Sequence, residues 1–116
     1  MALIEMDFAS GGGGSITGFE LEFIHASNEN TYTVENLEVG THYLFLIYQG
    51  SSSSKTYTQY DTTTFTNANA EKLSNLTSAN TYANGTFFDV VPTATSVTIS
   101  NSSALFKCIG FKAKTS

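Results

Sequence analysis

The chain has 116 residues, enough for one domain with one core, and only 13% of them are charged. The net charge is −5, with five lysines and no arginine, which leaves no clustered basic surface for binding nucleic acid. One cysteine excludes a disulfide framework and a zinc site built on cysteine pairs, and no apolar run is long enough for a membrane span.

Small uncharged polar residues dominate the composition: 17 Thr, 14 Ser and 9 Asn make up 40 of the 116 residues. Hydrophobic residues account for 41% and aromatic residues for 13%, which is too apolar for a disordered chain with so little charge. Threonine and aromatic residues are typical of strands, so the composition predicts an all-β domain. The start of the chain, with Glu5 and Asp7, does not have the basic and then apolar pattern of a signal peptide.

The first predicted element is an apolar arm at residues 1–10. Its side chains alternate as in a half-buried strand, with two acids on one side and apolar residues on the other. The residues expected to make its contacts are Leu3, Ile4, Met6 and Phe8. The arm cannot bury its apolar face alone, so we expect it to add to a sheet edge of its own domain or of a neighbouring subunit.

A flexible hinge at residues 11–15 connects the arm to the rest of the chain. It consists of Gly11, Gly12, Gly13, Gly14 and Ser15. Residues 16–116 are predicted to form a single domain, because strand signals recur through them at short intervals.

Two patterns in the first half of this domain predict strands. Phe19, Leu21 and Phe23 alternate with glutamates, which predicts a strand with these three side chains on one face and the glutamates toward solvent. Residues 41–49, THYLFLIYQ, are apolar on both faces and predict a central strand buried on both sides. His42 begins that strand, where we expect a hydrogen-bonded structural histidine rather than a general base.

The second half of the domain is more polar. Residues 55–65 predict a solvent-facing or edge strand, and residues 67–80 are the only stretch with helical character, for about two turns of helix. Asn84 followed by Gly85 predicts a tight two-residue hairpin turn. The strand after it is expected to end at Pro92.

Residues 97–112 predict a closing hairpin with its turn at residues 101–103. The whole pattern contains eight or nine short strands and at most one short helix. It predicts an all-β fold, an antiparallel β-sandwich that is jelly-roll-like.

No arrangement of residues predicts catalysis. Cys108 lies within an apolar alternation, which is typical of a small buried hydrophobe, and no serine lies in a GxSxG turn. The carboxylates lack the spacing of a calcium loop, and the glycine run lacks the lysine of a phosphate loop. We therefore expect no enzymatic activity, no metal and no cofactor.

Tyrosines and amide side chains are suited to sugar recognition, because rings stack on sugars while amides bond their hydroxyl groups. The residues whose clustering favours a glycan contact are Tyr57, Gln59, Tyr60 and Asp61. Tyrosines also cap sandwich edges and fill subunit interfaces, which is the alternative interpretation of this cluster.

The opening MALIEMDFAS with its glycine run, the strand GTHYLFLIYQG and the terminal segment SVTISNSSALFKCIGFK together resemble small virion proteins of tailed bacteriophages. The chain is similar in style to the β-sandwich modules of phage fibres, baseplates and head appendages. The resemblance implies a structural protein located in the virion and present in many copies, whose arm attaches to a neighbour. It supplies no catalytic residues.

These expectations define the partners. We expect other virion proteins and further copies of the chain, as a trimer or a higher ring, because the apolar arm and the many aromatic residues exceed what one small core needs. The alternative function is a glycan- or receptor-binding module, with a host surface glycan as partner; a bacterial surface or secreted adhesin module would fit the composition too. Neither nucleic acid nor membrane insertion is expected.

Overall fold

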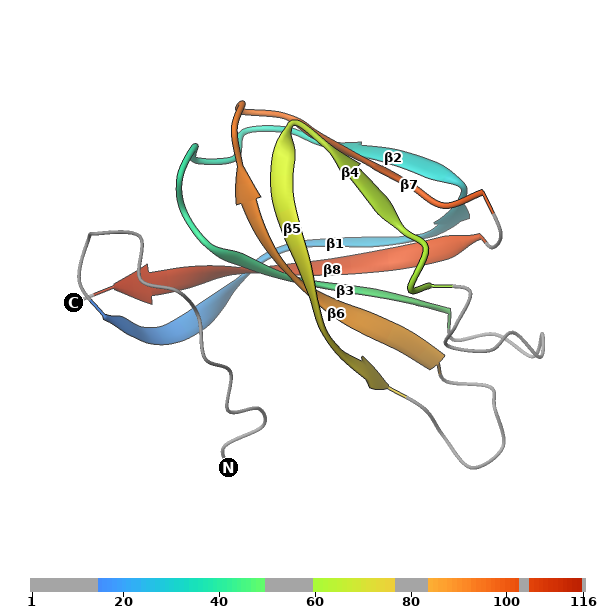
Figure 1. Ribbon diagram of the computed structural model, residues 1–116, viewed down its shortest axis with the longest axis horizontal. Helices are drawn as coiled ribbons and strands as arrows, with labels where there is room; N and C mark the ends of the chain where they lie inside the picture. The colour runs from blue at the N-terminus through green and yellow to red at the C-terminus, as the bar shows by residue number, and fades with distance from the viewer. Residues whose placement is uncertain (1–14, 50–59, 77–83, 103–104, 116) are drawn as a thin grey trace.

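The computed structural model describes residues 15–49, 60–76, 84–102 and 105–115. These residues form eight strands and no helix, arranged as two antiparallel sheets that face each other (Figure 1). The strands are β1 (Ile16–Glu29), β2 (Thr31–Val34), β3 (Tyr43–Gln49), β4 (Thr64–Thr66), β5 (Ala68–Leu76), β6 (Asn84–Pro92), β7 (Val97–Ser100) and β8 (Phe106–Thr115).

The strand order confirms the jelly-roll-like sandwich. One sheet has the order β1-β8-β3-β6-β5 and the other the order β2-β7-β4. The first strand pairs with the last, β2 with β7 and β3 with β6, as in a long hairpin that is rolled up into two sheets. The departure is β5, which pairs with β6 and so widens the larger sheet to five strands.

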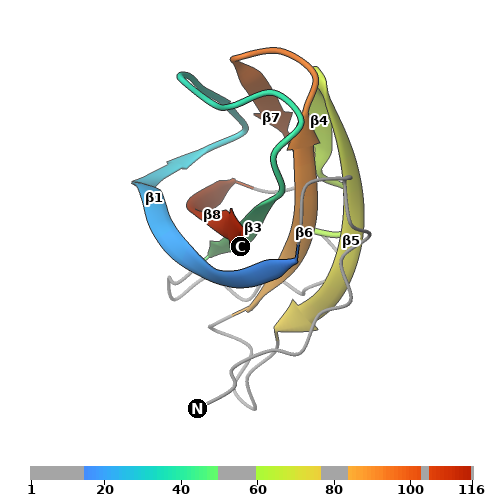
Figure 2. The ribbon, with the colours of Figure 1, turned by 90° about the vertical axis from the view of Figure 1, so that its left-hand side faces the viewer.

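Two polar corners carry the chain from one sheet to the other. Asn30 alone separates β1 from β2, and its carbonyl oxygen accepts a hydrogen bond from the Asn101 backbone N–H at 2.9 Å. The side chain of Asn101 is buried and donates to Thr63 Oγ1 at 2.9 Å. At the other corner Asn67, with a φ of 67°, separates β4 from β5. Seen end-on, β1 and β5 lie at opposite sides of the molecule (Figure 2).

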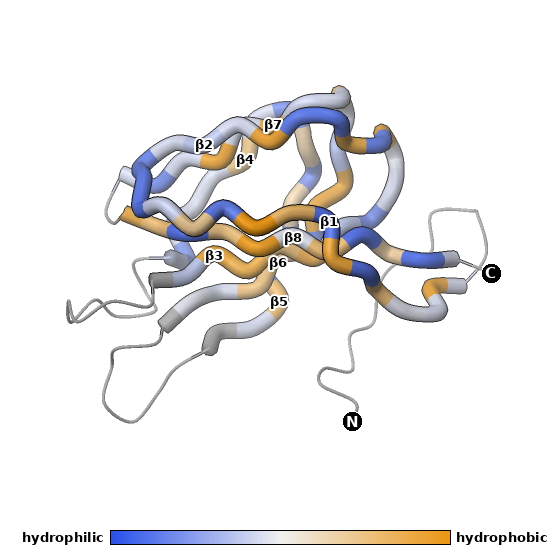
Figure 3. Tube along the Cα trace, turned by 180° about the vertical axis from the view of Figure 1, so that it is seen from behind, coloured by the Kyte–Doolittle hydropathy of each residue, from blue (hydrophilic) through white to orange (hydrophobic). Residues whose placement is uncertain are grey.

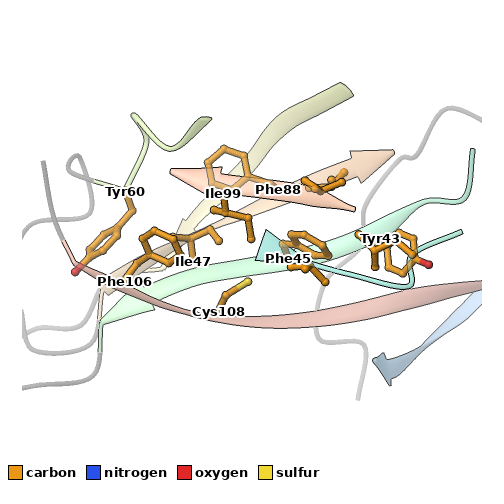
Figure 4. Packing of buried hydrophobic residues seen from close by; sticks show 12 residues of the cluster. Tyr43, Phe45, Ile47, Tyr60, Phe88, Ile99, Phe106 and Cys108 are labelled. Carbon is orange, nitrogen blue, oxygen red and sulfur yellow. The ribbon is translucent and has the colours of Figure 1, made fainter. Parts of the chain in front are cut away.

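The core lies between the two sheets. Its buried side chains come from alternate positions of each strand, as the period of a strand requires (Figure 4). The central members are Tyr43, Phe45, Ile47, Phe88, Val90, Val97, Ile99, Phe106 and Cys108. Three of them belong to β3, the middle strand of the five-stranded sheet, so the prediction of a central strand is confirmed. Its burial on both sides is confirmed in part, because on the outer face Leu44 is buried while Leu46 and Tyr48 are only half-buried.

The prediction of a helix within residues 67–80 is wrong for residues 67–76, the part of this range that the structure describes. Residues 68–76 form β5, which pairs with β6 along its length, from Ala68 opposite Pro92 to Leu76 opposite Gly85. Two turns of helix are marginal without tertiary contacts, whereas a strand at this position gains a complete ladder with its neighbour. The result is a domain with no helix in the described residues.

The predicted tight turn at Asn84 and Gly85 is also wrong, because both residues belong to β6 and pair with β3. Glycine is required there for a different reason: a Cβ atom on Gly85 would lie 2.7 Å from the carbonyl oxygen of Ile47. The end of this strand at Pro92 is confirmed.

The predicted closing hairpin is wrong as well. β7 and β8 are consecutive in sequence but belong to different sheets, and the chain changes sheet at the corner beside Asn101. In the expected strand at residues 55–65, the described part begins with a turn at residues 60–62, and strand structure starts at Thr64; residues 55–59 lie outside the described residues.

Candidate functional site

Most of the predicted site residues lie outside the described residues. These are the arm residues Leu3, Ile4, Met6 and Phe8, the glycines 11–14, and the cluster members Tyr57 and Gln59. Of the glycan cluster, the structure places Tyr60 and Asp61.

Tyr60 is a core residue. Its side chain has no exposed surface and lies at the end of the buried cluster opposite Tyr43 (Figure 4). Burial raises the pKa of its phenol to about 12. A ring without exposed surface cannot stack on a sugar, so the expected glycan contact at Tyr60 is wrong. The turn causes this placement: the Tyr60 carbonyl accepts hydrogen bonds from Thr63 N at 3.1 Å and Thr63 Oγ1 at 2.7 Å.

Asp61 ties the same turn to the five-stranded sheet. Its Oδ1 accepts a hydrogen bond from Thr86 Oγ1 of β6 at 3.2 Å, and its Oδ2 lies 3.4 Å from Lys72 Nζ of β5. The side chain is 24% exposed. The carboxylate therefore already serves as a structural anchor on two strands.

His42 and Asp89 form an enclosed pair on the five-stranded sheet. Nδ1 of His42 lies 2.8 Å from Oδ1 of Asp89, and the two side chains are 14% and 10% exposed. Burial raises the pKa of Asp89, the bond to His42 opposes that rise, and the charge of Glu71 across the ladder adds to it. The prediction of a hydrogen-bonded structural histidine is confirmed.

A second histidine strengthens the corner between β1 and β2. The ring of His25 stacks on Tyr32, with centroids 3.6 Å apart, and its Nε2 lies 2.5 Å from Glu29 Oε2. Across the ladder from His25 lies Cys108, which is fully buried. Burial raises the pKa of this thiol, the opposite of what a nucleophilic cysteine needs. The prediction that Cys108 is a buried hydrophobe is confirmed.

The outer face of the five-stranded sheet, which points away from the core, is buried in its middle and exposes large apolar side chains at the β1 edge. Hydrophobic residues recur along β1, β8, β3 and β6 (Figure 3). Leu21 and Ile24 of β1 are 56% and 58% exposed, and they pair across the ladder with Phe111 and Ile109 of β8. Partners in a ladder point to the same side of a sheet. We call these four side chains the β1 strip.

The sequence pattern missed this strip because of a β-bulge. The register of β1 against β8 shifts between Leu21 and Phe23, so that Glu22 is an extra residue. As a result Leu21 and Ile24 share the outer face, while Phe23 turns inward against Phe45 at a centroid distance of 5.2 Å. The expectation that Phe19, Leu21 and Phe23 lie on one face is therefore wrong. The adjacent apolar residues Phe23 and Ile24, which interrupt the alternation, are the signal that marks the bulge.

We found no match to this chain among known protein families, curated proteins or solved structures. Within the described ranges, no helix has the length and apolar character needed to cross a membrane. In that same part of the chain, no group of three His, Cys, Asp or Glu side chains is placed to hold a metal ion. The β1 strip is the candidate functional surface because Leu21 and Ile24 are more than half exposed at a sheet edge.

Proposed function

We propose that the protein is a structural subunit of a bacteriophage virion, of surface, fibre or decoration type. In this proposal the N-terminal arm, residues 1–10, joins each subunit to neighbouring copies or to other virion proteins. The observation that carries the proposal is the β1 strip, where two large apolar side chains at a sheet edge are more than half exposed. Contiguous exposed apolar surface is typical of protein–protein contacts.

The fold supports this proposal at the level of analogy. Jelly-roll sandwiches are a common architecture of viral capsid domains and of lectins. The low content of charged residues also suits a surface that packs against copies of itself, because few charges then lose their water on assembly.

The titratable groups of the described residues support an assembly role over catalysis. His42 is bonded to Asp89, His25 to Glu29, and Asp61 to Lys72, so these pairs already hold strands and corners together. The remaining nucleophile candidate, Cys108, is buried. We therefore propose that the protein is not an enzyme. The apolar arm and the β1 strip are the reason for proposing a trimer or a higher ring.

The arm is tested in the full-length chain with the variant Ile4→Ser/Met6→Ser/Phe8→Ser. The matched control is Glu5→Ser/Asp7→Ser, which changes the other side of the same segment. Light scattering at tens of micromolar should give an oligomer for the wild type and the control and a monomer for the first variant. A monomeric wild type, or an unchanged oligomer in the first variant, would contradict the assembly role.

The virion location is tested on particles. An antibody against the recombinant protein should label intact phage particles produced by cells that carry the gene, and mass spectrometry of purified particles should detect the chain. Particles that form without the protein in them would refute the proposal whatever the oligomeric state.

A glycan- or receptor-binding module is the second proposal, because lectin domains share the same architecture. Its contacts would include Tyr57 and Gln59, since Tyr60 and Asp61 are used by the fold. A glycan array with the wild type and with Tyr57→Ala tests it. We expect binding that the variant loses; an array without binding, or equal binding by both proteins, would count against it.

A further inference from the structure

The β1 strip lies at an edge that has no neighbour among the described strands. β1 is the first strand of the order β1-β8-β3-β6-β5, and with 14 residues it is the longest strand described. Along such an edge, backbone groups point outward and can pair with another strand. An edge with no neighbour among the described strands and exposed apolar side chains therefore coincide on the same element.

Apolar side chains continue from the strip toward the middle of the sheet, where they become buried. Behind Leu21 and Phe111 lies Leu44 of β3, and behind Ile24 and Ile109 lies Leu46. Exposure falls along the first row, from 56% at Leu21 at the edge to 7% at Leu44 in the middle of the sheet. Single exposed apolar residues are common on any protein, whereas Leu21 and Ile24 lie on the same face of one edge strand.

We propose that the β1 strip is the receiving site for residues 1–10 of a neighbouring copy of this chain. The arm lies along β1, with Ile4, Met6 and Phe8 on Leu21 and Ile24. This inference rests on the proposed function, in which the arm connects subunits, and it adds where the arm binds.

Length and pattern both favour this occupant. Ten residues in strand form extend about 33 Å, more than the segment from Leu21 to Ile24 needs at about 3.3 Å per residue. The arm repeats its apolar side chains every second residue, which is the spacing of side chains on one face of a strand. Its acids, Glu5 and Asp7, fall on the other side and so point away from the strip.

The opposite edge of the same sheet does not fit the arm. On β5, Asn69, Glu71 and Lys72 are exposed, so that edge offers charge and amide groups in place of apolar surface. An acidic, apolar arm gains less there, because burying Glu71 and Lys72 would cost their hydration. β5 is therefore the matched control for β1.

Cross-linking between two different chains tests the inference. One full-length protein carries Met6→Cys and the other carries Leu21→Cys, and a tag makes their sizes distinct. The two are mixed under mild oxidation, and the mixed disulfide is measured on a non-reducing gel. The native Cys108 can stay, because it is fully buried. The control partner carries Asn69→Cys, on the exposed edge strand β5.

We expect about tenfold more mixed disulfide with Leu21→Cys than with Asn69→Cys, since docking raises the local concentration of the arm at β1. Equal yields would overturn the inference. A disulfide that forms only within a single chain carrying both Met6→Cys and Leu21→Cys would overturn it too, since the arm would then cover its own subunit.

A second variant separates this inference from the proposed function. Ile24→Lys should abolish the oligomer without lowering the melting temperature of the subunit, whereas Glu71→Lys on β5 should leave the oligomer intact. If Ile24→Lys remains oligomeric while the arm variant Ile4→Ser/Met6→Ser/Phe8→Ser does not, the assembly role stands and the receiving site is wrong. If neither variant changes the oligomer, both proposals fail.

Discussion

The two edges of the five-stranded sheet differ in what they present to solvent. The β5 edge carries exposed Glu71 and Lys72, and charged side chains of this kind keep a sheet edge from pairing with other chains. The β1 edge carries exposed glutamates too, Glu20 and Glu22, but it adds two large apolar side chains that are more than half exposed, Leu21 and Ile24. The two edges thus differ in exposed apolar surface rather than in the presence of charge, and under the proposed function the β1 edge is the one that a neighbour covers.

The same contrast exists within β1, between neighbouring residues. Phe23 points into the core, where its ring lies 5.2 Å from that of Phe45, while Ile24 points outward and is 58% exposed. The bulge at Glu22 produces this arrangement. A core contact and an exposed apolar side chain are therefore neighbours on one strand, and the predictions below test whether their roles are separate.

The largest effect is expected from comparing Phe23→Ala with Ile24→Ala. The first removes a ring that packs against the core and should lower the free energy of unfolding by about 2–3 kcal/mol, somewhat less than for a fully buried phenylalanine. The second removes an exposed side chain and should cost less than about 0.5 kcal/mol in the isolated subunit. Urea unfolding at a concentration where the subunit is monomeric measures both. Equal costs would show that the two faces of β1 are not distinct.

A somewhat smaller effect is expected at Gly110 of β8, the ladder partner of Phe23. A Cβ atom at this position would collide with the ring of Phe23, so Gly110→Ala should destabilise the subunit by about 1–2 kcal/mol through overpacking. The double variant Gly110→Ala/Phe23→Leu should be more stable than the sum of the two single changes predicts, because the shorter side chain makes room. Simple additivity in urea unfolding would rule out this contact as the cause.

Much of the fold was predictable because its signals are local and strong. The apolar run at residues 41–49 identified the central strand, Pro92 marked the end of β6, and the alternation around Cys108 identified a buried thiol. Each of these depends on the period of a single strand or on one residue with a fixed backbone preference.

The features that the sequence did not predict depend on pairing between distant residues. The strand at residues 68–76 is stabilised by its ladder with β6 against a weak local helix preference. The bulge at Glu22 is a property of the register between β1 and β8. The alternation of residues along β1 alone therefore could not predict that Leu21 and Ile24 share a face. Tyr60 was predicted to be a binding residue on a polar strand. The prediction was wrong because a turn, not a strand, holds this residue and directs its ring inward.

The smallest effect is expected at Glu71, an exposed acidic residue of the edge strand β5. Glu71 lies across the ladder from Asp89, and its charge adds to the burial that raises the pKa of Asp89, while the bond to His42 opposes both. The folded state therefore holds this proton more tightly than the unfolded state, and the stability it contributes is lost as the pH rises from about 3.8 through the raised pKa.

Glu71→Gln removes the repulsion, so relative to the wild type it should become more stable as the pH rises through that window toward neutrality. Asp89→Asn keeps an oxygen for the bond to His42 and should show the same trend more strongly. Melting temperatures from pH 3 to pH 7 are compared between variant and wild type. The comparison cancels the contribution that other carboxylates make to the pH dependence of stability, such as Glu38, whose lowered pKa acts in the opposite sense. A difference that stays constant across this pH range would mean that the charge of Glu71 does not destabilise the ionised form of Asp89 on the neighbouring strand.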